Sequence, residues 1–157
     1  MELLILLLPL IASIISGFFG RYIGDRNSEI VTSLLVSITA IISFIVFYNV
    51  IVNQYEDNIT IATWISSGTL DVNWSMKIDT LSAVMLVVVT SVSALVHIYS
   101  IGYMSHDPHK PRFMAYLSLF TFAMLMLVTA DNFIQLFFGW EGVGLCSYFL
   151  IGFWFKK

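Results

Sequence analysis

Glu141 is the residue whose type and position point most directly to chemistry. It lies near the middle of residues 133–155, a stretch that is otherwise largely apolar and long enough to cross a bilayer. A carboxylate in hydrocarbon is destabilised by on the order of several kcal/mol, so such residues usually face a bundle interior or a wet cavity and mark an ion or proton path. We interpret Glu141 as a candidate proton carrier. The alternative is a protonated Glu141 that hydrogen-bonds a neighbouring helix and serves only packing.

The residues around Glu141 leave space beside its carboxylate. Gly144 and Tyr148 share its helix face at offsets of three and seven, and Gly139 and Gly142 lie close by. These glycines serve either close helix packing or room for water or another helix. A carboxylate with a movable cationic partner can load and release a proton. Every Lys and Arg lies at or outside a predicted helix end, so a partner for Glu141 must come from elsewhere.

His97 is the second candidate. Together with Thr90, Ser93 and Ser100 it recurs at spacings of three and four, which places the four side chains on one helix face. Small polar groups on such a face commonly hydrogen-bond a neighbouring helix. The alternative is a wet path with His97 as a proton relay, since the pKa of an unperturbed histidine is about 6.5.

The composition identifies an integral membrane protein. Of the 157 residues, 59% are hydrophobic and 11% charged, against about 45–50% and about 25% in soluble domains. The start carries Glu2 and no Lys or Arg, so the first apolar run is predicted to be a retained helix rather than a signal peptide. The net charge is -3 and no basic patch favours nucleic acid.

The fold class expected is an all-α membrane domain with five spanning helices and a small extramembrane β-hairpin, all in one domain of residues 1–157. The predicted spans cover residues 3–20, 30–52, 80–103, 113–129 and 133–155, with a polar loop at 21–29. Residues 70–79 alternate apolar and polar, which predicts a half-buried strand, so residues 53–79 are expected to form the hairpin. Asp79 and Asp131 stand at predicted helix starts, where a carboxylate complements the helix dipole.

The positive charges predict the orientation. With five spans, one side of the membrane holds six of the seven Lys and Arg residues and the other side holds Lys77. The six are Arg21, Arg26, Lys110, Arg112, Lys156 and Lys157. The positive-inside rule makes their side cytoplasmic or its equivalent, with the N-terminus and the hairpin outside.

Other chemistry finds little support in the residues. His106, Asp107 and His109 could be drawn as a metal site, but their spacing matches no strong motif and indicates a solvated loop. The single Cys146 gives no disulfide framework. Neither a cysteine cluster for iron–sulfur ligation nor a Gly-x-Gly-x-x-Gly loop for a dinucleotide is present. We therefore expect no metal or cofactor site in this chain.

Several stretches resemble a known family. They are residues 79–85, His97-Ile-Tyr-Ser-Ile-Gly-Tyr-Met104, residues 112–120 and residues 131–154, which include Gly-Trp-Glu-Gly-Val-Gly-Leu around Glu141. They look like the largest antiporter-like membrane subunit (chain L) of proton-translocating NADH–quinone oxidoreductase, respiratory complex I. The resemblance covers nearly the whole chain, and the sequence around Glu141 is its most specific part.

The resemblance implies that Glu141 is the intramembrane glutamate of a proton channel, which in the family pairs with a lysine on a seventh helix. It implies a partial antiporter-like fold, a role as an enzyme subunit without a redox site of its own, and a bacterial plasma or mitochondrial inner membrane. NAD, FMN, iron–sulfur clusters and quinone would bind other subunits. The chain lacks the family's later lysines, most of its two inverted repeats and its lateral helix. It therefore looks like an N-terminal portion, with a companion chain supplying the missing helices if the gene is split.

Two other functions stay open at this point. The chain could be a non-pumping structural remnant or assembly module, or part of a cation/proton antiporter. Sister subunits and antiporters of the family carry a glutamate at the same place in different surroundings, so the Gly-Trp-Glu-Gly-Val-Gly sequence favours the respiratory complex. Its expected partners are other membrane subunits of that complex and membrane lipid.

Overall fold

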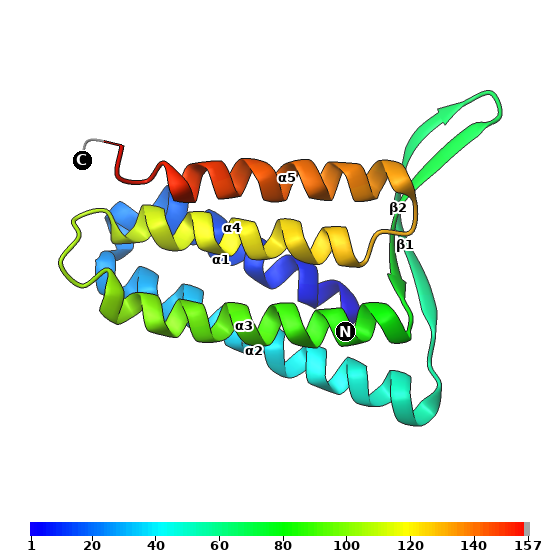
Figure 1. Ribbon diagram of the computed structural model, residues 1–157, viewed down its shortest axis with the longest axis horizontal. Helices are drawn as coiled ribbons and strands as arrows, with labels where there is room; N and C mark the ends of the chain where they lie inside the picture. The colour runs from blue at the N-terminus through cyan, green and yellow to red at the C-terminus, as the bar shows by residue number, and fades with distance from the viewer. Residues whose placement is uncertain (156–157) are drawn as a thin grey trace.

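A computed structural model describes residues 1–155; Lys156 and Lys157, which the charge pattern assigns to the positive side, lie outside the described residues. Five helices lie side by side, and a β-hairpin runs across one end of them (Figure 1). The elements in chain order are α1 (Glu2–Ile23), α2 (Asp25–Asn53), β1 (Asp57–Ser67), β2 (Leu70–Ile78), α3 (Thr80–Tyr103), α4 (Lys110–Val128) and α5 (Phe133–Ile151). All five helices are long and apolar enough to cross a membrane. The predicted fold class is confirmed.

The polar stretch 21–29 is not the loop that its composition predicts. α1 continues to Ile23 and α2 begins at Asp25, so only Gly24 separates the two helices. Gly24 has φ +90, which glycine adopts without a Cβ clash. Arg21 in the last turn of α1 and Asp25 in the first turn of α2 each complement a helix dipole. The polar residues therefore stabilise helix ends and do not interrupt the helices.

The helices form a four-helix bundle with a fifth helix on its side. α1 packs on α2 and α4, and α2 packs on α3, while α5 packs chiefly on α4. Near the hairpin the bundle interior is apolar, with Ile5, Val46, Leu86 and Leu125 among its buried residues. From the middle to the opposite end many buried side chains are polar, although Val36, Met104 and Met114 are buried there too. These polar residues are Ser13, Ser16, Ser28, Glu29, Thr32, Ser33, Thr39, Ser43, Thr90, His97, Ser100, Ser118 and Thr121.

Many of these buried hydroxyls bond to their own helix. Thr32, Thr39, Ser43 and Thr90 each donate to the carbonyl four residues earlier, at distances between 2.6 and 2.9 Å. Such bonds remove the cost of burying a hydroxyl without a partner. The polar half of the bundle can therefore exist inside an apolar membrane protein.

The side chains of two residues predicted at helix starts behave differently. Asp79 caps α3, with its Oδ1 accepting from the Ser82 N–H at 2.8 Å, and that bond holds the pKa of Asp79 below its usual range. At α5 the cap is Asn132 rather than Asp131, because the Asn132 Oδ1 accepts from the Gln135 N–H at 2.8 Å. The carboxylate of Asp131 instead accepts from the Ser75 hydroxyl at 3.3 Å.

The hairpin is joined to the bundle along the free edge of β2. Gln135, fully buried at the start of α5, accepts from the Ser75 N–H at 3.0 Å and donates to the Ser75 carbonyl at 2.7 Å. The Lys77 N–H donates to the Thr129 carbonyl at 2.9 Å. The side chain of Asn132 donates to the Asn73 carbonyl at 2.8 Å. The connection between α4 and α5 thus takes the place of a third strand and covers an otherwise open edge.

Replacing Gln135 with methionine tests this attachment. The Q135M side chain has a similar volume but leaves the buried N–H and carbonyl of Ser75 unpaired, at a cost of about 1–3 kcal/mol. We expect faster hydrogen–deuterium exchange of the Ser75 and Lys77 amides in lipid nanodiscs. The control is Q54M, at the exposed C-cap of α2. Equal exchange in both variants would contradict the proposed attachment.

Candidate functional site

Glu141 lies eight residues into α5 on the face turned away from α4. At 1.5 Å per residue this places it about 12 Å from the hairpin end of the helix, close to mid-helix. Its side chain is exposed, as are those of Phe137, Trp140 and Tyr148 on the same helix. The face that sequence spacing predicts for Glu141 and Tyr148 is therefore an outer surface of the five helices.

The glycines near Glu141 divide between the two roles that the sequence leaves open. A Cβ at Gly139 would lie 2.9 Å from the Cα and N of Leu127, and one at Gly142 would lie 3.3 Å from the Cβ of Ala123. Both glycines therefore allow α5 to approach α4 closely. A Cβ at Gly144 would meet nothing within 4 Å. Gly144 leaves open space one turn from the Glu141 carboxylate.

Glu141 makes neither a hydrogen bond nor an ion pair within residues 1–155. The described basic residues are Arg21, Arg26, Lys77, Lys110 and Arg112. All five lie in the hairpin or in the first or last turns of helices. The structure thus presents a single carboxylate at mid-helix on an otherwise apolar surface.

His97 is fully buried between α3 and α4. Its Nδ1 lies 2.7 Å from the Ser93 carbonyl, which accepts only, so this nitrogen carries the proton in the neutral ring. Its Nε2 lies 3.1 Å from the Ser118 hydroxyl and is then the acceptor. The Ser93 hydroxyl bonds to that of Thr121, and Thr121 donates to the Leu117 carbonyl at 3.0 Å.

These bonds are of the interhelical kind, one of the two roles that the sequence leaves open for His97, and they also form a continuous polar chain. Ser93, His97, Ser118 and Thr121 link side chain to side chain across the α3–α4 contact. Donor and acceptor can alternate along such a chain when hydroxyls rotate.

The structure does not bring His97 and Glu141 together. His97 bonds to the inward face of α4, which carries Ser118 and Thr121. α5 packs on another face of α4, through Ala123 and Leu127. The two candidates therefore lie on opposite sides of α4.

Glu29 is a buried carboxylate that sequence reasoning misses. Because of its polar neighbours it is predicted to be a loop residue, yet it lies in the second turn of α2 and is 4% exposed. Its Oε1 lies 4.0 Å from the Nζ of Lys110 at the start of α4. The sequence does hold a signal for it, because Glu29 continues a stripe of small residues at Ser33, Ala40 and Ser43 with helical spacing.

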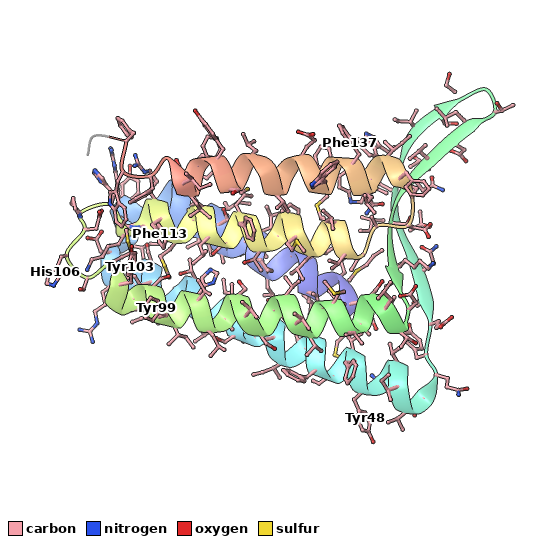
Figure 2. The ribbon with its side chains drawn as sticks, in the orientation of Figure 1. Tyr48, Tyr99, Tyr103, His106, Phe113 and Phe137 are labelled. Atoms are coloured by element: carbon pink, nitrogen blue, oxygen red, sulfur yellow. The ribbon has the colours of Figure 1, made fainter. Side chains whose placement is uncertain are left out.

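The loop between α3 and α4 lies at the end opposite the hairpin, where His106 is labelled in Figure 2. Both His106 and His109 are exposed. Asp107 accepts from the indole N–H of Trp154 and from the backbone N–H of His109, each at 2.7 Å. Among the residues described, no three His, Cys, Asp or Glu side chains lie close enough together to hold a metal.

Comparison with known sequences identifies two families that match separate stretches of the chain. A family described as the N-terminus of chain 5 of NADH–ubiquinone oxidoreductase (complex I) matches residues 64–114. The transmembrane family of NADH:quinone oxidoreductase and the Mrp antiporter matches residues 130–157. The second match includes Glu141 and the glycines around it.

Relatives that match this chain along its whole length agree with these family matches. The chain is 57% identical to part of NADH-ubiquinone oxidoreductase chain 5 of Arabidopsis thaliana and 58% identical to part of that of Marchantia polymorpha. The chain is related to chain 5 of complex I. The resemblance to the largest antiporter-like subunit, as an N-terminal portion, is thereby confirmed.

The matched segment is only a part of each relative. The whole chain covers 24% of the length of both of these chain 5 relatives. It is also 48% identical to part of a Neurospora crassa protein named probable intron-encoded endonuclease 4, of which it covers 29%. The names of these relatives therefore belong to proteins that are several times longer than this segment.

The bonds around His97 predict a spectroscopic signature. In the chain labelled with ¹⁵N-histidine, the Nδ1 of His97 should appear protonated and the Nε2 should appear as an acceptor, because the Ser93 carbonyl fixes the tautomer. In S118A the Nε2 signal should shift as its donor is lost, while the signals of exposed His106 and His109 stay unchanged. A rapidly exchanging mixture of tautomers at His97, unaffected by S118A, would contradict this geometry.

Proposed function

We propose that this chain is part of a membrane subunit of an NADH–quinone oxidoreductase and contributes to proton translocation coupled to quinone reduction. Glu141 is its protonatable residue. The observation that carries the proposal is the exposed Glu141 carboxylate at mid-helix on the outer face of α5, without a partner in residues 1–155. The similarity to chain 5 proteins supports the assignment to the respiratory complex.

Glu141 needs a covering partner because a charged carboxylate in lipid is unstable. A carboxylate at this depth is stable only when protein or water covers it, or when it is protonated. If the covering protein brings a cation, Glu141 becomes charged as that cation approaches and protonated as it withdraws. The open space at Gly144 leaves room for such a neighbour.

The partners follow from the same face. Other membrane subunits of the complex, or helices that complete this subunit in the same or a companion chain, cover α5 and supply the cation. Lipid covers the remaining apolar surfaces. NAD, FMN, iron–sulfur clusters and quinone bind to other subunits, so the chain serves an enzyme without holding its redox centres.

The orientation follows from the described basic residues. Arg21, Arg26, Lys110 and Arg112 lie at the helix ends opposite the hairpin, and Lys77 lies in the hairpin. The positive-inside rule then puts the hairpin and the N-terminus outside, in a mitochondrial inner or bacterial plasma membrane.

A cation/proton antiporter is the second candidate function. It is favoured by one observation, that the family matching residues 130–157 includes the Mrp antiporter as well as NADH:quinone oxidoreductase. In such an antiporter the same Glu141 would exchange a proton for a cation. Co-purification with quinone-reducing activity supports the respiratory complex, and its absence alongside cation exchange supports the antiporter. A chain that assembles normally, but in which no carboxylate variant changes pumping, would be a structural module.

The decisive variant is E141Q, made in the assembled complex. Glutamine keeps the shape of the side chain but cannot carry a proton, so we expect most of the proton translocation per electron to be lost while the complex still assembles. The control is E56Q, since Glu56 is exposed and lies between α2 and the hairpin. Unchanged pumping in E141Q with normal electron transfer would refute the role of Glu141.

A further inference from the structure

Three helix ends meet around Glu29 at the end of the bundle opposite the hairpin. The Ser16 hydroxyl of α1 donates to the Pro111 carbonyl of α4 at 2.7 Å. A Cβ at Gly20 would lie 2.6 Å from the Cβ of Pro111 and 3.5 Å from the hydroxyl of Ser28. Gly20 therefore allows the first turn of α4 to reach the start of α2, which places Lys110 beside Glu29.

In the Glu29–Lys110 pair the carboxylate is buried and the lysine is partly exposed to solvent. The side chain of Glu29 is 5% exposed and that of Lys110 is 20% exposed. Their closest atoms are 4.0 Å apart, longer than the roughly 2.7–2.9 Å of a charge-assisted hydrogen bond. The Lys110 ammonium thus lies between the solvent at the helix ends and the Glu29 carboxylate, which is itself shielded from solvent.

Three buried oxygen atoms here lack a hydrogen-bond partner among the described residues: Ser28 Oγ, Glu29 Oε1 and Ser33 Oγ. All three belong to the same stretch of α2. Buried oxygens are normally hydrogen-bonded to protein or to ordered water, and a buried carboxylate needs such bonds to remain charged. A fixed, fully bonded ion pair would not leave these buried oxygens without partners, whereas a site that admits a water molecule beside the carboxylate would satisfy them.

Few charges act on Glu29. They are Lys110 from α4 and Asp25 on its own helix. Arg21 on α1 is exposed, and α3 brings no charged residue within its bounds. Proton binding at Glu29 therefore depends mainly on its burial and on Lys110.

Buried polar side chains of α2 and α3 lie slightly deeper in the bundle than Glu29. Glu29 lies four residues from the end of α2 and His97 six residues from the end of α3, so along the bundle His97 is only about 3 Å deeper. Thr32 and Ser33 on α2 and Ser100 on α3 are buried at comparable depth. From His97 the bonded side chains of Ser118, Ser93 and Thr121 extend toward the middle of the bundle.

We propose that Glu29 and Lys110 form a proton-loading site at the positively charged end of the bundle, with His97 as the next protonatable group inward. The Glu29 carboxylate accepts a proton from water at that surface and releases it to the buried polar side chains deeper in the bundle. Lys110 stabilises the deprotonated state between transfers. The proposal rests on the proton-translocating function proposed above, but it concerns a site that is separate from Glu141.

The test uses the assembled complex with variants of Glu29. We expect E29Q to slow proton uptake from the positive side severalfold, because glutamine cannot bind the proton, and E29D to restore part of the rate. K110Q should move the pH profile of uptake, since Glu29 loses the cation that favours its charged form. The control is E56Q, which removes an exposed carboxylate at the hairpin end, where it does not act on Glu29, and should leave uptake unchanged.

Different results separate this site from Glu141. Normal uptake in E29Q with loss in E141Q overturns the loading site and leaves the role of Glu141 intact. Loss of proton uptake in E29Q with normal pumping in E141Q supports the loading site and refutes the proposed role of Glu141. Equal loss in E29Q and E29D, with an unchanged pH profile in K110Q, would mean that Glu29 is only a structural clamp.

A second measurement decides the question if E29Q does not assemble. Infrared difference spectra of the native chain and of K110Q and E56Q, each in lipid nanodiscs, report protonated carboxyl groups. A carboxyl band that titrates, exchanges in D₂O and moves in K110Q but not in E56Q is that of Glu29 and supports the loading site. The absence of any such band overturns it.

Discussion

A charge or polar group inside a bilayer is stable only where protein or water covers it, and the arrangement of these helices follows from that requirement. His97 and the hydroxyls around it meet it within the four-helix bundle, by bonding to each other and to helix carbonyls. Glu29 meets it in part, through burial beside Lys110. Glu141 does not meet it within residues 1–155, because it lies on the outer face of α5.

Buried polar side chains are unevenly distributed along the bundle, so its two ends differ in polarity. Near the hairpin the interior of the bundle is mainly apolar, with Ile5, Val46 and Leu125 among its buried residues. The edge of β2 is fixed there by Gln135 and the α4–α5 connection. At the other end the buried polar groups begin at Glu29 and reach His97 and Thr121. The proton route proposed within α1–α4 therefore starts at the positively charged end.

Much of the fold can be predicted from the sequence, because a spanning helix needs only length and apolar composition. What fails is the stretch 21–29, where local polarity suggests a loop although Gly24 alone makes the turn. That error hides Glu29, whose partner Lys110 is 81 positions away along the chain and meets it only through tertiary packing. Glu141 is found because one carboxylate in an apolar run is conspicuous, but its outward orientation depends on Gly139 and Gly142 facing α4, which spacing alone does not decide.

The most direct test of the central claim is a high-resolution structure of the assembled membrane complex around Glu141. We expect protein from outside residues 1–155 to cover the outer face of α5 and to bring a lysine or arginine nitrogen within about 4 Å of the Glu141 carboxylate, the distance of an ion pair. Lipid acyl chains or a wholly apolar helix packed directly against Glu141 would contradict it, because the carboxylate would then have no partner with which to load and release a proton.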